Sequence, residues 1–174
     1  MLRERVTEDV FVFISSLYAE VSAVVVTTPD GAVVIDTLPF PEETSQVREF
    51  ALRRCPRGIR YVINTHHHAD HVYGSYLFPE AELIAHRQCR DILLKVGEES
   101  LAQAKAQTAM LAPVELRIPQ LVFEVDLLLR LGEKTIHLIH APGHSPDGVM
   151  VHLREDKVLV ASDILAPVPL LVRG

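Results

Sequence analysis

The stretch Thr65-His66-His67-His68-Ala69-Asp70-His71 places four histidines and one aspartate within seven residues. It directly follows Tyr61-Val62-Ile63-Asn64, an apolar run typical of a buried strand. A strand that ends in such a loop delivers these side chains to the edge of a sheet. Imidazole and carboxylate groups suit a borderline divalent ion such as zinc, and iron or manganese would also accept them. An internal, mixed run of this kind predicts a metal site rather than a solvated turn.

The spacing within the run predicts which side chains share a face. Side chains alternate along extended backbone, so His66 and His68 are expected to point the same way and His67 the opposite way. A turn after the strand would bring Asp70 and His71 to the side of His66 and His68. We therefore expect His67 to lie outside the ligand set.

Two more motifs follow downstream, Ala141-Pro142-Gly143-His144-Ser145 and Ala161-Ser162-Asp163. Together with His66-x-His68-x-Asp70-His71 and Gly74, they resemble the metallo-β-lactamase superfamily. The first run resembles its HxHxDH signature, the second its Pro-Gly-His-(Thr/Ser) loop, and the third its metal-bridging aspartate. The order and spacing of these motifs agree over almost the whole chain.

The resemblance implies an α/β (α+β) fold, a four-layer αββα sandwich with the metals at the strand ends. The implied ligands are six residues of two metal sites: His66, His68 and His144 for the first, Asp70 and His71 for the second, and Asp163 bridging both. Zinc would be the cofactor, with two ions in the active site, one at each of these two metal sites, although iron or manganese would also fit.

The resemblance also implies a function. A water held between two cations becomes hydroxide near neutral pH and attacks a carbonyl or phosphoryl centre. Asp70 would orient this hydroxide and help to move its proton, and Gly143 would let the backbone turn sharply to present His144. The implied function is metal-dependent hydrolysis of a small-molecule ester, thioester, lactone or phosphodiester. A β-lactam substrate is disfavoured, because Asp163 stands where the common β-lactamase subclass carries a cysteine.

The chain departs from the family pattern after Asp163. Binuclear members usually supply one more histidine beyond that aspartate, and none follows here before Gly174. We therefore expect one domain over residues 1–174 that is truncated at its C-terminus, with the second half of the sandwich incomplete. Apolar surface left uncovered in this way drives association, so a homo-oligomer is expected.

Two alternatives to the hydrolase stay open. The first is a mononuclear non-haem iron oxidoreductase resembling the persulfide dioxygenases, with iron on His66, His144 and Asp163. The second is a metal-binding domain that is catalytically weak because its second site is incomplete. Metal identity separates the hydrolase from the oxidoreductase, and turnover of generic substrates separates it from the weak domain.

Composition excludes several classes of protein. The 174 residues are 48% apolar and 23% charged, which fits one globular domain. The net charge of −6, without a basic block, argues against a nucleic-acid partner. No apolar run is long enough to span a bilayer, and residues 1–9 lack a signal-peptide core, so we expect no membrane partner and a cytoplasmic location. Cys55 and Cys89 are expected to be reduced structural thiols.

The hydrophobic pattern predicts alternating strands and helices. Helices are expected from Pro41 to about Cys55 and from about His86 to Leu111, the latter bent or divided at Gly97, with a linker over 112–119 between two halves of the domain. Expected strands are 10–14, 23–27, 32–36, 61–64, 82–85, 121–123, 127–131, 134–140, 149–153 and 157–161.

Histidines and carboxylates outside the motifs are harder to assign. Asp36, at the end of a predicted strand, is equally compatible with hydrogen-bond support of the metal ligands and with a simple strand-end carboxylate. His86 fits a helix cap or a surface residue better than a site residue. The strand residues His137, His140 and His152 are not expected to be ligands.

Overall fold

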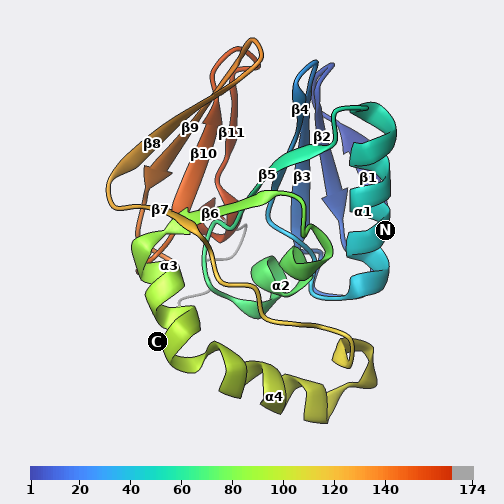
Figure 1. Cartoon of the computed structure of the whole chain (residues 1–174), viewed down its shortest axis with the longest axis vertical. Coiled ribbons are helices and arrows are strands. Elements are labelled where there is room, and N and C mark those ends of the chain that lie inside the picture. Colours follow the sequence, from blue (N-terminus) through green and yellow to red (C-terminus); the bar gives the residue numbers. More distant parts are fainter. Residues whose placement is uncertain (166–174) are drawn as a thin grey trace.

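Side chains alternate between the two faces of the strands Ser22–Thr28 (β3) and Gly31–Ile35 (β4), and this alternation determines how the layers stack. Both strands are almost entirely buried, so each must be covered on both faces. Ala23 and Val25 belong to the core beneath a helix, whereas Val24 and Val26 belong to the core shared with a second sheet. The computed structural model, which describes residues 1–165, accordingly has two sheets facing each other (Figure 1).

The first sheet has seven strands in the order β1-β2-β3-β4-β5-β6-β7. Its first four strands are antiparallel, and β4 to β7 are parallel. The second sheet is antiparallel, in the order β11-β10-β9-β8. The remaining strands are Leu2–Arg5 (β1), Val10–Ile14 (β2), Ile59–Ile63 (β5), Glu82–His86 (β6), Leu121–Phe123 (β7), Asp126–Leu131 (β8), Lys134–His140 (β9), Val149–Leu153 (β10) and Val158–Val160 (β11).

Helices cover the first sheet and one end of the molecule. The helix Pro41–Arg54 (α1) lies along the first sheet, and Val47, Phe50 and Ala51 enter the core beneath it (Figure 1). The other helical segments are Ala69–Val72 (α2), Tyr73–Leu77, Arg87–Ile92 (α3), the π-helix Leu93–Gly97, Glu98–Gln107 (α4), Ala109–Leu111 and Ser162–Leu165. Over residues 1–165, no helix has the length and apolar character needed to cross a membrane.

Most of the predicted elements are present, with two differences. Leu2–Arg5 forms the edge strand β1, which its alternating charges did not indicate; all four residues are exposed, and charges are common on a sheet edge. The predicted linker over residues 112–119 is present as a connecting segment, but it does not mark the boundary between the two halves of the domain. Leu121–Phe123 still pairs with β6, so the second half begins only at β8. Gly97 does divide the long helical segment, at the end of the π-helix.

The expected αββα sandwich with an incomplete second half is confirmed for the described residues. Figure 1 shows no helix along the outer face of β8–β11 within residues 1–165. Leu128 and Leu159 on that sheet are about half exposed. The residues after 165, including the C-terminus at which the truncation is predicted, lie outside the described residues, and the homo-oligomer stays a prediction.

Gly74 brings the segment after the histidine run into close contact with α1. A Cβ at this position would lie 2.5 Å from Oγ1 and 2.7 Å from Cγ2 of Thr44, and 2.8 Å from Cβ of Thr37. The backbone N–H of Gly74 donates to Oγ1 of Thr37. Gly74 is therefore required by packing, because any side chain would push this segment away from α1.

We predict that Gly74→Ala lowers the free energy of unfolding by about 1–3 kcal/mol, the usual cost of overpacking a dense core. Gly143→Ala is the matched control, because a Cβ there meets nothing within 4 Å and Gly143 does not have a positive φ. It should change stability by less than about 0.5 kcal/mol. Urea unfolding of both variants measures the difference, and equal effects would contradict this account of Gly74.

Candidate metal centre

Four segments deliver ligand-type side chains to one end of the two sheets. His66 and His68 follow β5, and α2 carries Asp70 and His71. His144 lies in the loop between β9 and β10. The sixth predicted ligand, Asp163, lies in the 3-10 turn Ser162–Leu165 after β11.

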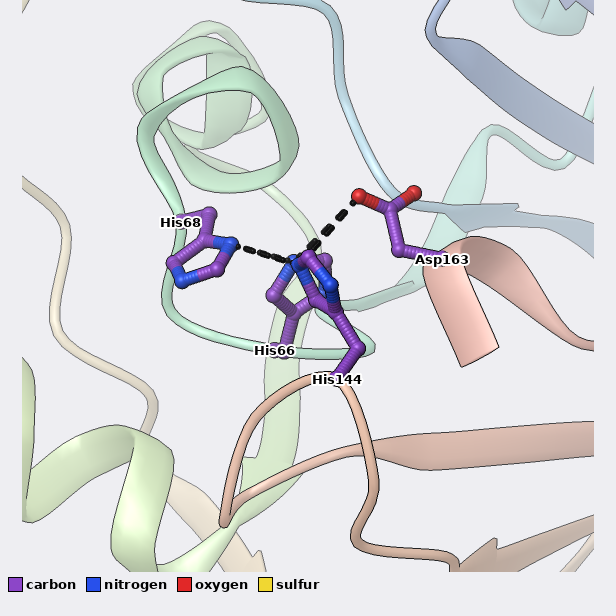
Figure 2. A group of neighbouring side chains, drawn as sticks. All are labelled: His66, His68, His144 and Asp163. Atoms are coloured by element: carbon purple, nitrogen blue, oxygen red, sulfur yellow. Dashed lines mark hydrogen bonds and ion pairs between the residues drawn. The ribbon is translucent and has the colours of Figure 1, made fainter. Parts of the chain in front are cut away.

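Three histidines and Asp163 form the first donor group, His66, His68, His144 and Asp163, whose ligand atoms all lie within 4.8 Å of one another. Nδ1 of His68 lies 3.0 Å from Nε2 of His66 and 2.9 Å from Nε2 of His144. Oδ2 of Asp163 lies 3.4 Å from Nε2 of His144. Figure 2 shows the three rings and the carboxylate converging from separate parts of the chain.

Asp70, His71 and Asp163 form the second donor group. Nε2 of His71 lies 3.7 Å from Oδ2 of Asp70 and 3.4 Å from Oδ1 of Asp163. Asp163 belongs to both groups, with one oxygen near His144 and the other near His71. The structure thus brings all six predicted residues together in the predicted division.

These residues fit divalent metal ions. Nε2 of His71 is buried and makes no hydrogen bond within the described residues, although a buried polar atom normally has a partner. Zinc held tetrahedrally at about 2.0–2.1 Å sets neighbouring nitrogens about 3.3 Å apart, close to the spacing of the three rings. Imidazole and carboxylate donors are the types that zinc, iron and manganese accept.

His66 and His68 of the first group are neutral bases. Burial, followed by the positive charges of His71 and His68, lowers the pKa of His66 to about 2. Burial, followed by the charges of His67 and His144, lowers the pKa of His68 to about 4. Both rings therefore carry available lone pairs at neutral pH, as metal coordination requires.

His71 and Asp163 behave as an ion pair in the metal-free protein. Burial opposes a charge on His71, but Asp36 first, and then Asp163, outweigh it and raise the pKa of His71 to about 10. The interaction with His71 outweighs burial at Asp163 and lowers its pKa to about 2. A cation bound at Nε2 of His71 would take the place of this proton.

Asp36 contacts His71 and two residues that neighbour predicted metal ligands. Its Oδ1 accepts from the backbone N–H of Thr65, and its Oδ2 accepts from the hydroxyls of Thr65 and Ser162. Oδ2 also lies 2.9 Å from Nδ1 of His71, which directs Nε2 of that ring toward the site. Asp36 has φ of 57°, in the left-handed region. Of the two readings left open by the sequence, the hydrogen-bond support is the one observed.

Three of the remaining histidines, His67, His86 and His140, make contacts outside the donor groups. His67 points away from the donor groups, as expected, and its Nδ1 lies 2.9 Å from Oδ1 of Asp147. Nδ1 of His86 accepts from the N–H of Gln88 and caps α3, so this cap prediction is confirmed, while the ring itself is buried. His140 stacks on His86 with ring centroids 3.8 Å apart.

Two sequence-based expectations about small residues meet different outcomes. The backbone bends at Gly143, but Gly143 does not have a positive φ and a Cβ there would meet nothing within 4 Å, so the bend does not require glycine. The tightest approach in this loop is instead at Gly148, where a Cβ would lie 2.8 Å from the carbonyl oxygen of Ala141. Cys55 and Cys89 are free and buried, as expected.

Sequence reasoning missed Thr65, Ser162 and Asp147. Thr65 and Ser162 directly precede predicted ligands, and this adjacency is the only signal in the sequence that could have indicated their role. Asp147 stands in a Pro-Asp-Gly turn signal and is expected at the surface, yet it is completely buried. Burial raises the pKa of Asp147, but the hydrogen bond and charge of His67 outweigh it and lower the pKa to about 2.

Comparison with known proteins places these features in one family. The family model of the metallo-beta-lactamase superfamily matches residues 19–172. The acyl-coenzyme A thioesterase MBLAC2 of Bos taurus is 26% identical over 112 residues, which are 59% of this chain and 40% of the thioesterase. The chain therefore spans less than half the length of this relative.

Solved structures share the fold. A metallo-beta-lactamase from Pontibacter korlensis aligns with a TM-score of 0.70 at 19% identity, over 92% of this chain and 70% of that one. BJP-1, a subclass B3 metallo-beta-lactamase of Bradyrhizobium japonicum, aligns with a TM-score of 0.65 at 20% identity, over 87% and 56% of the two chains. With the family model covering most of its residues, the chain belongs to the metallo-β-lactamase superfamily.

Proposed function

We propose that this chain binds two zinc ions and hydrolyses a small-molecule thioester or related ester. The first ion would be held by His66, His68 and His144, and the second by Asp70 and His71. The observation that carries the proposal is the position of Asp163, whose Oδ2 lies 3.4 Å from His144 and whose Oδ1 lies 3.4 Å from His71. A carboxylate directed at two separate donor groups suits two ions better than one.

The two cations, when bound, would lower the pKa of a water between them and polarise the substrate oxygen. The chain supplies the remaining functions. Oδ2 of Asp70 is the available base for the proton of the attacking water, within 3.7 Å of His71. Asp36 keeps the ring of His71 in one orientation through Nδ1.

A thioester is the favoured substrate on the evidence of similarity. The relative from Bos taurus is described as an acyl-coenzyme A thioesterase, and its matched segment covers more than half of this chain. Lactones, oxygen esters and phosphodiesters present the same kind of electrophilic centre and are the substrates to compare. The net charge of −6 disfavours a nucleic acid as substrate.

The mononuclear iron oxidoreductase is the less favoured candidate. It would use His66, His144 and Asp163, but Nδ1 of His68 lies within 3.0 Å of both ring nitrogens and would have to be excluded from the ion. A single ion on those three residues would also leave Asp70 and His71, the other members of the second donor group, without an ion.

We predict close to two equivalents of zinc per chain after dialysis against zinc and removal of excess. His71→Ala should reduce the content to about one equivalent, because it removes a ligand of the second group alone. His137→Ala, on the outer face of the second sheet, is the control and should keep the wild-type content. Elemental analysis measures both: one equivalent of iron would favour the oxidoreductase, and no metal would contradict the metal centre.

We predict that Asp70→Asn lowers kcat for thioester hydrolysis by at least about 100-fold, the usual contribution of a general base. Asp126→Asn, an exposed carboxylate on β8, should have no effect. The rates are measured with a chromogenic thioester and normalised to bound zinc, so that a loss of metal is distinguished from a loss of the base. An Asp70→Asn rate close to that of the wild type would contradict this role.

A further inference from the structure

His67 is the one histidine of the four-histidine run that the metal centre does not use. Its neighbours on both sides, His66 and His68, are proposed ligands of the first ion. Its own side chain turns away from them and is about a quarter exposed, with Nδ1 at 2.9 Å from Oδ1 of Asp147. The run therefore reaches across to the loop that carries His144.

Asp147 is an unusual residue to find at that position. Its side chain is completely buried, and a carboxylate is almost never fully buried without a partner. His67 is the hydrogen-bond partner of Oδ1, while Oδ2 makes no hydrogen bond within the described residues. The thiol of Cys89 on α3 lies next to the same carboxylate, and burial, followed by the charge of Asp147, raises the pKa of that thiol well above its usual value.

Hydrogen bonds within the loop that carries Asp147 and His144 join its two ends and its middle. The backbone N–H of Ala141 donates to the carbonyl of Gly148, and the N–H of Gly143 donates to that of Ser145. Nε2 of His140 lies 2.9 Å from the carbonyl of Pro146, in the middle of the loop. A loop closed on itself in this way moves as one unit, so a contact at Asp147 also locates His144.

Apart from the contact of His144 with His68 inside the first donor group, one backbone hydrogen bond also joins this loop to the histidine run. The backbone N–H of Val149 donates to the carbonyl of Thr65 at 2.9 Å. This bond lies where the histidine run leaves β5 and where the β9–β10 loop enters β10. The contact between His67 and Asp147 lies two residues farther into each segment. Outside the donor group itself, these two contacts fix a relative orientation of the loop and the run that one contact would leave free.

We infer that His67 and Asp147 form a positioning pair that sets the separation between the ring nitrogens of His66 and His68 and that of His144. The inference rests on the metal centre proposed above. A hydrogen bond to a buried carboxylate is stronger than one between neutral groups. Such a bond is therefore suited to fixing the position of one loop relative to the other. Neither residue belongs to a donor group, so both would act on a bound ion through their neighbours in the chain.

Three variants test the pair. Asp147→Asn removes the charge, His67→Ala removes the donor, and His67→Asn restores a donor, because the amide nitrogen of Asn branches from Cγ as Nδ1 of His does. We expect Asp147→Asn and His67→Ala each to weaken zinc affinity by about tenfold or more, the usual effect of residues that orient metal ligands. His67→Asn should lie within about threefold of the wild type, and the double variant His67→Ala/Asp147→Asn should be no weaker than the weaker single variant.

Two readouts separate positioning from simple stabilisation. Zinc affinity is measured by competition with a chromogenic chelator, and ligand geometry by the visible d–d bands of the cobalt-substituted protein. Thermal unfolding of each metal-free variant runs alongside. Glu43→Gln is the matched control: Glu43 is an equally buried carboxylate that binds Ser15 and Ser16 in another layer, so its loss should lower the unfolding temperature but leave the cobalt bands unchanged.

The inference is supported if His67→Ala shifts the cobalt bands and weakens zinc binding while His67→Asn restores both. It is overturned if His67→Ala lowers only the unfolding temperature and leaves affinity and bands as in the wild type. If Asp147→Asn does not fold, the two His67 variants decide the question. A wild-type protein that binds no metal overturns the metal centre and the pair together, whereas metal binding that is indifferent to His67 overturns the pair alone.

Discussion

The metal centre depends on one buried carboxylate, that of Asp36. It receives hydrogen bonds from Thr65 at the start of the histidine run and from Ser162 beside Asp163, and it faces Nδ1 of His71. Three ligand-bearing segments are thereby attached to the end of a single central strand, β4. Because buried donors lose more by going unpaired than they gain by pairing, the removal of this one acceptor would affect all three segments at once. The left-handed backbone at Asp36 is consistent with a residue retained for its site.

The arrangement of the sheets explains why the ligands come from such distant parts of the chain. The parallel strands β4 and β5 end at the same edge, so Asp36 and the histidine run are neighbours there. The second sheet packs face to face on the first and brings the β9–β10 loop and the turn after β11 to that edge. Neither sheet carries a complete donor set, because Asp163 from the second half completes both groups. Sheet packing and metal binding are therefore coupled, and a bound cation would stabilise the contact between the halves.

Most strands and helices were predictable, because their hydrophobic periodicity is local. Val24 to Val26, Val47 with Phe50, and Ile136 with Leu138 show the expected patterns and are buried. The strand at Leu2–Arg5 was not predictable, since an exposed edge strand has no buried face to impose alternation. Leu121–Phe123 was recognised as a strand but assigned to the wrong half, because a short apolar run does not specify its partner. The Pro-Gly pair likewise marks the bend at Gly143 without stating its dihedral angles, and these do not require glycine.

The sequence by itself determined the chemistry: four histidines and an aspartate at fixed spacing, with His144 and Asp163 following in order, define a metal-binding member of one superfamily. Ligand type and short spacing are properties of the covalent chain, so they can be read without a fold. Tertiary structure alone decided that Asp36 supports the site, that Gly74 must lack a side chain, and that His67 meets Asp147 eighty positions away. These facts depend on which polar side chains become buried and on which distant surfaces meet, and a local pattern does not specify either.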